Sequence, residues 1–325
     1  MDKARFAIIG SGNIAQSHMQ AISNLPNAEV AVTVDIVEER AEQAAQKYGA
    51  RRWTTSAEDA LADDAVDAVS ICLPPNLHER YALMAAKAGK HILVEKPMAI
   101  TLRECDHMIA AAQEAGVTLM VGQVLRFREA NREARRLILS GAVGRPTHII
   151  RRRHSFTKES KNEPWADDPA VAGGWVLYGF GAHEIDTILY LNDAEGKTTF
   201  ALGQKTNPRW KDYDDIDIVF ELSNGAIANM THTVNVKPGA WDCVLAGTEG
   251  CITITSDELS VNGETLPQKF DFKGGMQRQL AEFVSAVMEG REPEASGKDV
   301  RRTMQVLEAV KISLAEKRPV EADQL

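Results

Sequence analysis

A glycine-rich run near the N-terminus has the spacing of a phosphate-binding turn. Gly10-Ser11-Gly12-Asn13-Ile14-Ala15 follows a short apolar stretch and opens an amphipathic helical pattern. The first glycine allows a tight turn, the second lets the backbone approach a pyrophosphate, and the small Ala15 lets the helix pack on the strand. The free N–H groups of a helix N-terminus attract anionic oxygens. We therefore predict that Gly10, Gly12, Asn13 and Ile14 bind a dinucleotide.

Asp35 lies 20 residues after Ala15, at the end of the second apolar run. A carboxylate in this place can accept hydrogen bonds from both ribose hydroxyls of NAD. The 2'-phosphate of NADP would bring about two negative charges against it. The sequence therefore predicts NAD as the cofactor, while the nearby Arg40 keeps NADP open as the less favoured choice.

The elements around these residues alternate between strands and helices. Apolar runs predict strands at Arg5–Ile9, Val30–Asp35, Ala68–Leu73, His91–Glu95 and Thr118–Val121. Alanine-rich amphipathic patterns predict helices at Ile14–Leu25, Val37–Tyr48, Leu77–Ala88 and Leu102–Ala115. This alternation predicts an α/β domain over residues 1–122, with a doubly wound parallel sheet of the Rossmann type.

Residues 123–325 have a different pattern, which predicts an α+β domain with a large, mainly antiparallel open sheet. Helices are expected at Ala130–Leu139, from Gly173-Gly174 to about Leu191, at Met276–Met288 and at Asp299–Ala315. Strands are expected at Thr147–His154, Asp215–Leu222, Ala226–Val236 and Val244–Ile254. Asn224-Gly225 between two of these strands is a strong hairpin signal.

The composition excludes several classes of partner. A formal net charge of -9 argues against nucleic acid and anionic membranes. Arg151, Arg152 and Arg153 are consecutive, but a strand would point them to alternate faces. We expect a cytoplasmic protein with four free cysteines, since no pair has CxxC spacing and no apolar run is long enough to span a bilayer. No metal site is expected, because His148, His154 and His232 lack ligand spacing.

Lys96 is unusual in its place, since it ends an apolar strand and precedes a proline. A charge there costs free energy of desolvation, which suggests that the lysine has a function. Together with the glycine run, Pro75-Asn76-Leu77-His78, and Gly173-Gly174 followed by His183-Glu184-Ile185-Asp186, the motif Glu95-Lys96-Pro97 resembles the glucose-fructose oxidoreductase / inositol dehydrogenase / MocA family. The resemblance covers nearly the whole chain. It implies an NAD(P)-dependent dehydrogenase acting on a CH–OH group of a sugar, a polyol or a related carbohydrate derivative. It also implies a homodimer or homotetramer formed through the C-terminal sheet.

The resemblance assigns two catalytic residues. Lys96 would hydrogen-bond the substrate oxygen and stabilise developing alkoxide charge, and His183 would take the hydroxyl proton. Further cofactor contacts are implied at Pro74, Asn76, His78, Glu95 and Lys96.

The chain departs from the family pattern at Gly179, where relatives carry an aspartate four residues before the histidine. Without that carboxylate we expect His183 to titrate low, and Tyr178 is the next candidate for the base. Further candidates for substrate contacts are Arg126, Trp165 and Tyr178. Arg126 could instead form an ion pair at the junction of the two domains.

Two other functions remain open. One is an NAD-dependent lyase or epimerase that oxidises a sugar hydroxyl transiently and recovers its hydride within one turnover. The other is a non-catalytic nucleotide-binding regulator, which the missing aspartate at Gly179 favours and which Lys96 and His183 disfavour. Net turnover of the cofactor separates a dehydrogenase from both.

Overall fold

The computed structural model describes residues 2–157, 165–255, 258–271 and 273–325. The chain forms two compact units: residues 1–123 with 276–301, and residues 124–275 with 302–325. Residues 276–301 pack in the first unit, where the Phe283 ring lies 5.7 Å from the ring of Phe6.

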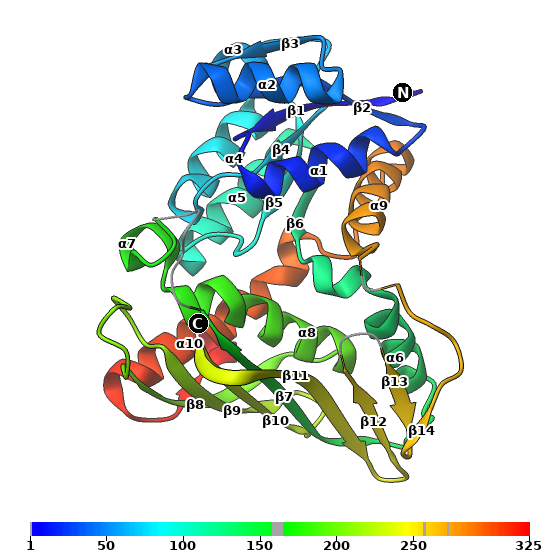
Figure 1. Cartoon of the computed structure of the whole chain (residues 1–325), viewed down its shortest axis with the longest axis vertical. Helices are drawn as coiled ribbons and strands as arrows, with labels where there is room; N and C mark the ends of the chain where they lie inside the picture. The colour runs from blue at the N-terminus through cyan, green and yellow to red at the C-terminus, as the bar shows by residue number, and fades with distance from the viewer. Residues whose placement is uncertain (1, 158–164, 256–257, 272) are drawn as a thin grey trace. The chain divides into compact units, whose positions relative to one another are not determined.

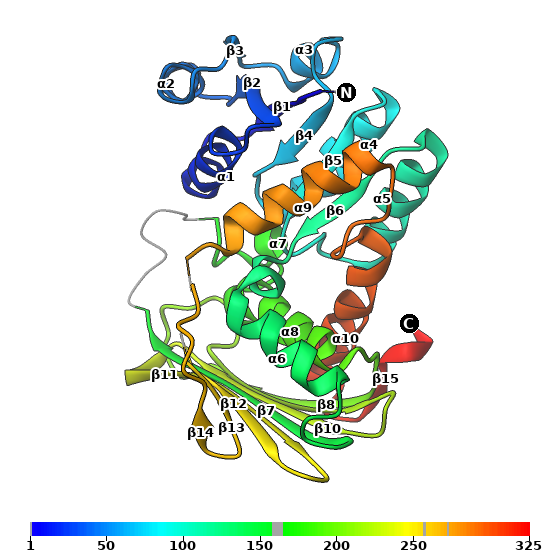
Figure 2. The same ribbon diagram turned by 90° about the vertical axis from the view of Figure 1, so that its right-hand side faces the viewer.

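The first unit is built on a six-stranded sheet in the order β3-β2-β1-β4-β5-β6, with every neighbouring pair parallel. Its strands are β1 Ala4–Ile9, β2 Ala28–Val34, β3 Arg52–Thr54, β4 Ala68–Ile71, β5 His91–Glu95 and β6 Leu119–Gly122. Its helices include α1 Asn13–Ser23, α2 Glu38–Tyr48, α3 Ala57–Leu61, α4 His78–Lys87, α5 Leu102–Ala115 and α9 Gly275–Glu289. Figures 1 and 2 show α1 and α2 on one face of the sheet and α4 and α5 on the other. This is the predicted Rossmann architecture, with its switch point between β1 and β4.

Local sequence explains the regularity of this unit. Four of the five residues of β5 are buried, as expected of a strand covered on both faces. The helix α5 begins with a capping box between Thr101 and Glu104, which satisfies two backbone N–H groups. It ends at Gly116 in the left-handed conformation with φ of 65°, where glycine is favoured.

The second unit contains a nine-stranded sheet in the order β14-β13-β12-β11-β7-β10-β9-β8-β15. Its strands are β7 Pro146–Phe156, β8 Gly196–Gln204, β9 Asp215–Leu222, β10 Ile227–Thr233, β11 Asn235–Gly247, β12 Cys251–Ile254, β13 Leu259–Val261, β14 Glu264–Thr265 and β15 Val320–Glu321. The sheet is mainly antiparallel, as predicted, although β7 and β10 pair in parallel. The predicted strand Val244–Ile254 is in fact two antiparallel strands, because the chain turns between Gly247 and Cys251.

Helices cover one face of this sheet. They include α6 Glu129–Leu139, α8 Ala182–Asn192 and α10 Gly297–Glu316, and Figure 2 shows α6 and α8 over the strands. The short helix α7 Pro169–Ala172 packs on the segment Trp175–Gly181. Short 3₁₀ turns lie at Pro75–Leu77, Val124–Phe127 and Ala322–Gln324. Buried and exposed residues alternate along β9, which is the pattern of a sheet covered on one face only. No helix in the described ranges is long and apolar enough to cross a membrane.

A buried ion pair ties α1 to the end of β5. His18 is fully buried, and its Nε2 lies 2.9 Å from Oε1 of Glu95, while Nδ1 lies 2.8 Å from the Ser70 hydroxyl. Burial acts against the charged imidazole, but the nearby Cys72 sulfur and the Glu95 carboxylate raise the His18 pKa to about 10. Burial would likewise raise the pKa of Glu95, yet His18 holds it below its ordinary value. Each charge is therefore stabilised by the other.

This pair predicts a specific dependence of stability on pH. A histidine whose pKa rises from 6.5 when unfolded to about 10 when folded contributes stability in full below the lower value. That contribution is lost as the pH rises through the higher value. We expect His18→Gln to lower the free energy of unfolding by about 3–5 kcal/mol near neutral pH, because Glu95 loses its partner. The variant should also lose less stability than the wild type on going to alkaline pH.

Urea denaturation at both ends of this pH range measures the effect. The matched control is His107→Gln, since His107 is 47% exposed and pairs with Glu79 at the surface. An alkaline loss of stability that is the same in the wild type and in His18→Gln would contradict the role of the pair.

Candidate active site

The glycine turn lies at the switch point of the first sheet and leaves space above it. Gly10 has φ of +92°, and a Cβ on it would lie 2.5 Å from the carbonyl oxygen of Cys72, in the loop that follows β4. No other residue fits without displacing that loop. A Cβ on Gly12 would meet nothing within 4 Å. Gly12 precedes α1 without a side-chain cap, and the first turn of α1 has no acidic residue. The open turn and uncapped N–H groups suit a pyrophosphate.

Asp35 is joined directly to this turn. Its Oδ2 accepts a hydrogen bond from the backbone N–H of Ser11 at 2.9 Å, and its Oδ1 accepts one from that of Val37 at 2.9 Å. A carboxylate has about four acceptor positions, so both oxygens can accept further bonds. Ile36 beside it is 89% exposed, which leaves an apolar side chain next to the carboxylate. This arrangement suits the adenosine end of a dinucleotide.

The loops after β4 and β5 are held together by His78. This residue is fully buried; its Nε2 lies 2.8 Å from the carbonyl oxygen of Leu73 and its Nδ1 lies 2.9 Å from that of Pro97. It therefore positions these loops from inside the unit rather than presenting its ring to solvent. Pro74 and Asn76 lie in the first of the two loops, where Asn76 is exposed.

Glu95 and Lys96 have different environments. Glu95 is buried in its pair with His18, and its Oε2 accepts a hydrogen bond from the backbone N–H of Lys96 at 3.1 Å. Lys96 is half-buried at the start of the following loop. The Glu95 carboxylate thus contacts both His18 and the backbone of Lys96. His18 was missed because its partner is far away in sequence.

In the second unit, the double glycine leads into an unusually wide helical turn. Gly173 ends α7 with φ of 78°, and Gly174 has φ of 115°. Residues Trp175–Gly181 then form a π-helix before α8 begins, whereas the sequence predicted a regular helix from the glycines onward. The indole of Trp175, the first residue of this segment, stacks on Trp210 with ring centroids 5.7 Å apart. Such segments are frequent at functional sites.

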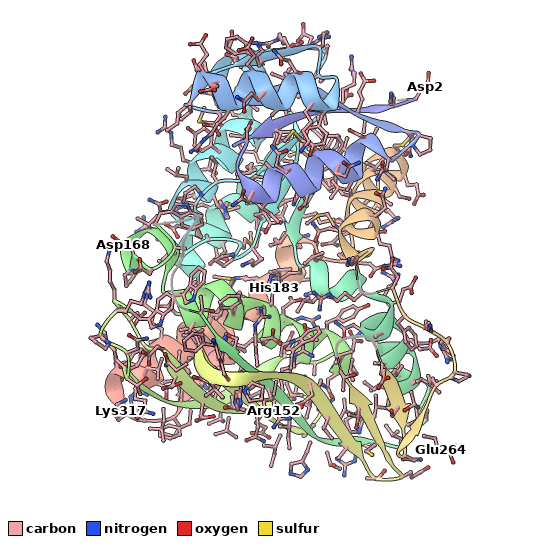
Figure 3. The ribbon with its side chains drawn as sticks, in the orientation of Figure 1. Asp2, Arg152, Asp168, His183, Glu264 and Lys317 are labelled. Atoms are coloured by element: carbon pink, nitrogen blue, oxygen red, sulfur yellow. The ribbon has the colours of Figure 1, made fainter. Side chains whose placement is uncertain are left out.

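His183 is the second residue of α8 and is half-buried; Figure 3 labels it at the start of that helix. Gly179 is also half-buried, in the wide turn. A Cβ on Gly179 would meet only Cε3 of Trp175, at 3.8 Å, an ordinary contact distance. Because positive φ is not required there, the backbone would accept a larger residue.

The three further candidates for substrate contacts lie in different surroundings. Tyr178 is 1% exposed, and its hydroxyl lies 3.5 Å from Oε2 of Glu308, which favours a packing role. Arg126 is also 1% exposed and donates two hydrogen bonds to Asp186, from Nε at 2.8 Å and from Nη2 at 2.6 Å. This bidentate pair lies within the second unit and favours a structural role. Trp165 is half-buried before α7.

Three arginines in consecutive positions of β7 alternate between faces, as predicted. Arg152 pairs with Asp242 on the open face, while Arg151 and Arg153 both bind the fully buried Glu184. Burial acts to raise the pKa of Glu184, but the two guanidinium groups lower it to about 2. Sequence reasoning missed this cluster, because it depends on how α8 lies across β7.

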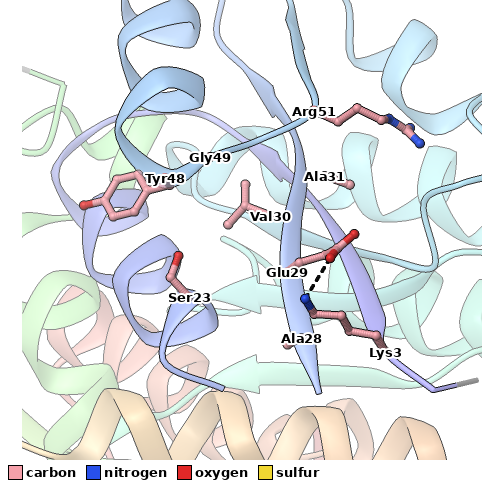
Figure 4. A pocket seen from close by; sticks show the side chains of 9 residues that line it. All are labelled: Lys3, Ser23, Ala28, Glu29, Val30, Ala31, Tyr48, Gly49 and Arg51. Carbon is pink, nitrogen blue, oxygen red and sulfur yellow. Dashed lines mark ion pairs between the residues drawn. The ribbon is translucent and has the colours of Figure 1, made fainter. Parts of the chain in front are cut away.

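Two other features do not contribute to this site. No group of three or more His, Cys, Asp or Glu residues in the described part of the chain could hold a metal ion, and the four cysteines are free thiols. A pocket of about 330 Å³ in the first unit (Figure 4) is lined by Glu29 and Ala31 of β2, and its Lys3–Glu29 ion pair measures 2.8 Å. It lies at the end of the sheet opposite to the glycine turn and does not belong to the dinucleotide site.

Comparisons with known proteins agree with this arrangement. Residues 4–123 match the oxidoreductase family with an NAD-binding Rossmann fold, and residues 131–253 match the GFO/IDH/MocA C-terminal domain. The chain is 27% identical to 4-carboxy-2-hydroxymuconate-6-semialdehyde dehydrogenase of Sphingobium sp., over 95% of this chain and 98% of the relative. It is 28% identical to scyllo-inositol 2-dehydrogenase (NAD(+)) of Bacillus subtilis, over 99% of this chain and 97% of the relative.

The fold is also known from solved structures. Aldose-aldose oxidoreductase from Caulobacter crescentus, solved with glycerol, superposes with a TM-score of 0.88 at 27% identity, over 98% of this chain and 99% of that one. The two matched domains, the glycine turn closed by Asp35, and similarity along nearly the whole chain lead to one conclusion. The protein belongs to the Gfo/Idh/MocA family of NAD(P)-dependent oxidoreductases.

Proposed function

We propose that this protein transfers a hydride between NAD and a hydroxyl-bearing carbon of a sugar, a polyol or a related carbohydrate derivative. The observation that carries the proposal is a half-buried imidazole, His183, at the start of α8 in a chain with an open dinucleotide turn. The names of the inositol dehydrogenase and the aldose-aldose oxidoreductase relatives support this substrate class.

The residues divide the chemistry of alcohol oxidation between them. Bound NAD supplies the hydride acceptor at its nicotinamide ring. His183 would take the hydroxyl proton of the substrate as its carbon gives up a hydride to that acceptor, which would leave a carbonyl. Lys96 hydrogen-bonds the same oxygen and stabilises its developing negative charge. The Glu95 carboxylate positions the backbone of Lys96 for this task.

An oligomer through the second sheet is part of the proposal. Several large apolar side chains on that sheet are more than a third exposed. They are Ile150, Phe156, Leu202, Val219 and Ile227. Apolar groups spread over one open sheet face favour association with a second copy of the chain, as a homodimer or a homotetramer.

Cofactor choice is the first test of the site. We expect NAD to bind at least about tenfold more tightly than NADP, because Asp35 accepts ribose hydroxyls and repels a 2'-phosphate. Isothermal titration of both nucleotides measures this ratio. Asp35→Ala should weaken the binding of NAD and reduce the difference in affinity between NAD and NADP. Asp59→Ala, at the surface of α3, should leave that difference unchanged. Tighter binding of NADP by the wild type would overturn the role assigned to Asp35.

The catalytic assignments are tested by turnover. We expect His183→Ala to reduce kcat by about 10²–10⁴-fold, the usual cost of losing a positioned base. Lys96→Ala should reduce kcat to a similar extent and leave NAD affinity nearly intact, since Lys96 acts on the substrate oxygen. Lys87→Ala, which removes a lysine at the exposed end of α4, is the control. If a variant of either residue keeps most of the wild-type kcat, that residue has no catalytic role.

Gly179 tests how the base is tuned. We expect Gly179→Asp to move the acid limb of the pH–rate profile for oxidation to higher pH, because a nearby carboxylate stabilises the protonated imidazole. Gly179→Asn is the matched control: it has nearly the same shape and no charge, and should leave the limb in place. Equal shifts in both variants, or in neither, would show that position 179 does not act on His183 through charge.

A further inference from the structure

The backbone of Lys96 is held by a carboxylate that is itself buried. Oε2 of Glu95 accepts a hydrogen bond from the Lys96 N–H at 3.1 Å, and Glu95 is 6% exposed. Because a buried carboxylate has little access to water, its direction depends on donors within the protein. His18 is such a donor, with Nε2 at 2.9 Å from Oε1. The two oxygens are bonded to one carbon, so a contact that fixes Oε1 also fixes Oε2.

The imidazole of His18 is in turn held at both ring nitrogens. Nδ1 lies 2.8 Å from the Ser70 hydroxyl, and that hydroxyl lies 3.5 Å from the sulfur of Cys72. Burial acts against the charged form, but the Cys72 sulfur and the Glu95 carboxylate raise the His18 pKa to about 10. At neutral pH the ring is therefore protonated and donates from both nitrogens. The Ser70 oxygen accepts from Nδ1, which leaves the Ser70 hydrogen for the sulfur.

Gly122 leaves room for the carboxylate on its other side. This glycine ends β6 and pairs with Glu95 of β5. A Cβ on Gly122 would lie 2.7 Å from Oε1 and 3.1 Å from Cδ of Glu95, closer than such atoms can approach. The φ angle of Gly122 is not positive, so glycine is needed there for space and not for its conformation.

The carboxylate acts on Lys96 through charge as well as through the backbone bond. Burial would raise the pKa of Glu95, but His18 lowers it, and the positive charge of Lys96 acts in the same direction to a smaller extent. The attraction is mutual. All of these residues belong to the first unit, so the connection from His18 to Lys96 does not depend on how the two units are arranged.

We propose that His18 is a positioning residue for Lys96 and acts through the Glu95 carboxylate. His18 does not touch the substrate. It fixes the carboxylate that holds the first residue of the loop after β5, and so places the Lys96 ammonium for the substrate oxygen. This inference rests on the proposed function, since it assigns a role in the reaction that Lys96 serves.

Kinetics of His18→Gln test the role. We expect kcat for sugar or polyol oxidation to fall by about 10–100-fold, because small displacements of a catalytic group have costs of this size. The KM for the substrate and the Kd for NAD should change by less than about threefold, because His18 contacts neither ligand. The deuterium isotope effect on kcat should increase, since hydride transfer becomes slower relative to the other steps.

Ile22→Ala is the matched control for loss of stability. Ile22 is buried on α1, four residues after His18, and its truncation destabilises the packing of the same helix. The ion pair between His18 and Glu95 remains in this variant. We expect kcat and the isotope effect to stay within about threefold and at the wild-type value, respectively, because a folded enzyme with weaker packing keeps its catalytic geometry. Circular dichroism at the assay temperature establishes that each variant is folded.

Gly122→Ala provides a second variant, which carries the test if His18→Gln does not fold. It keeps both charges of the pair but displaces the Glu95 carboxylate, whose side chain can move. We expect a lower kcat with a midpoint of urea denaturation near that of the wild type. A wild-type kcat in each folded variant of His18 and Gly122 would overturn the proposal.

Hydrogen exchange tests the connection without any substrate. Pro97 has no backbone N–H, so mass spectrometry of a peptide that begins shortly before it can isolate the amide of Lys96. We expect this amide to exchange at least about tenfold faster in His18→Gln than in Ile22→Ala, because the acceptor on Glu95 is no longer fixed. Ile22→Ala accounts for exchange that comes from lower global stability.

The outcomes separate this inference from the proposed function. If sugars or polyols are oxidised and His18→Gln and Ile22→Ala have the same kcat, the positioning role is wrong and the dehydrogenase stands. If no sugar or polyol is oxidised, the proposed function fails, and hydrogen exchange decides whether His18 fixes Lys96. Faster exchange at Lys96 in His18→Gln alone would then support that link, and equal exchange in the two variants would overturn it.

Discussion

The buried carboxylate of Glu95 is the constraint on which the candidate active site of the first unit depends. A charge at the covered end of β5 is stable only with a partner, and His18 supplies it from α1. The other oxygen of the carboxylate then accepts a bond from the backbone of Lys96. The Glu95 carboxylate therefore fixes α1 against the sheet and positions the start of the loop that follows β5 at Lys96.

The second unit repeats this principle with Glu184. Here the buried carboxylate follows His183, and its partners come from β7 rather than from a neighbouring helix. The pairing holds the first turn of α8 on the sheet below it. Arg151 and Arg153 both bind this one carboxylate.

Sequence reasoning succeeded where local signals decide the structure. The strand His91–Glu95 and the helix Leu102–Ala115 have the predicted bounds, because a continuous apolar run and a capped amphipathic pattern leave little freedom. The wide turn at Trp175–Gly181 was missed, since a π-helix and an α-helix have similar local patterns.

Residues whose role depends on distant partners could not be assigned from sequence. His18 and Glu95 are 77 positions apart, and Arg126 meets Asp186 across 60 positions. No local pattern reveals such pairs. Alternation did predict that Arg152 points away from Arg151 and Arg153, but it could not show that the inner two share a carboxylate on α8.

The central claim is that a hydride passes from a substrate carbon to NAD with net turnover. The most direct measurement uses the best sugar or polyol substrate, with deuterium on the carbon that bears the reacting hydroxyl. The reduced cofactor is then recovered and analysed by mass spectrometry. We expect one deuterium on the nicotinamide of each reduced cofactor formed. Reduced cofactor without deuterium, or a converted sugar that retains its label while no reduced cofactor accumulates, would contradict it.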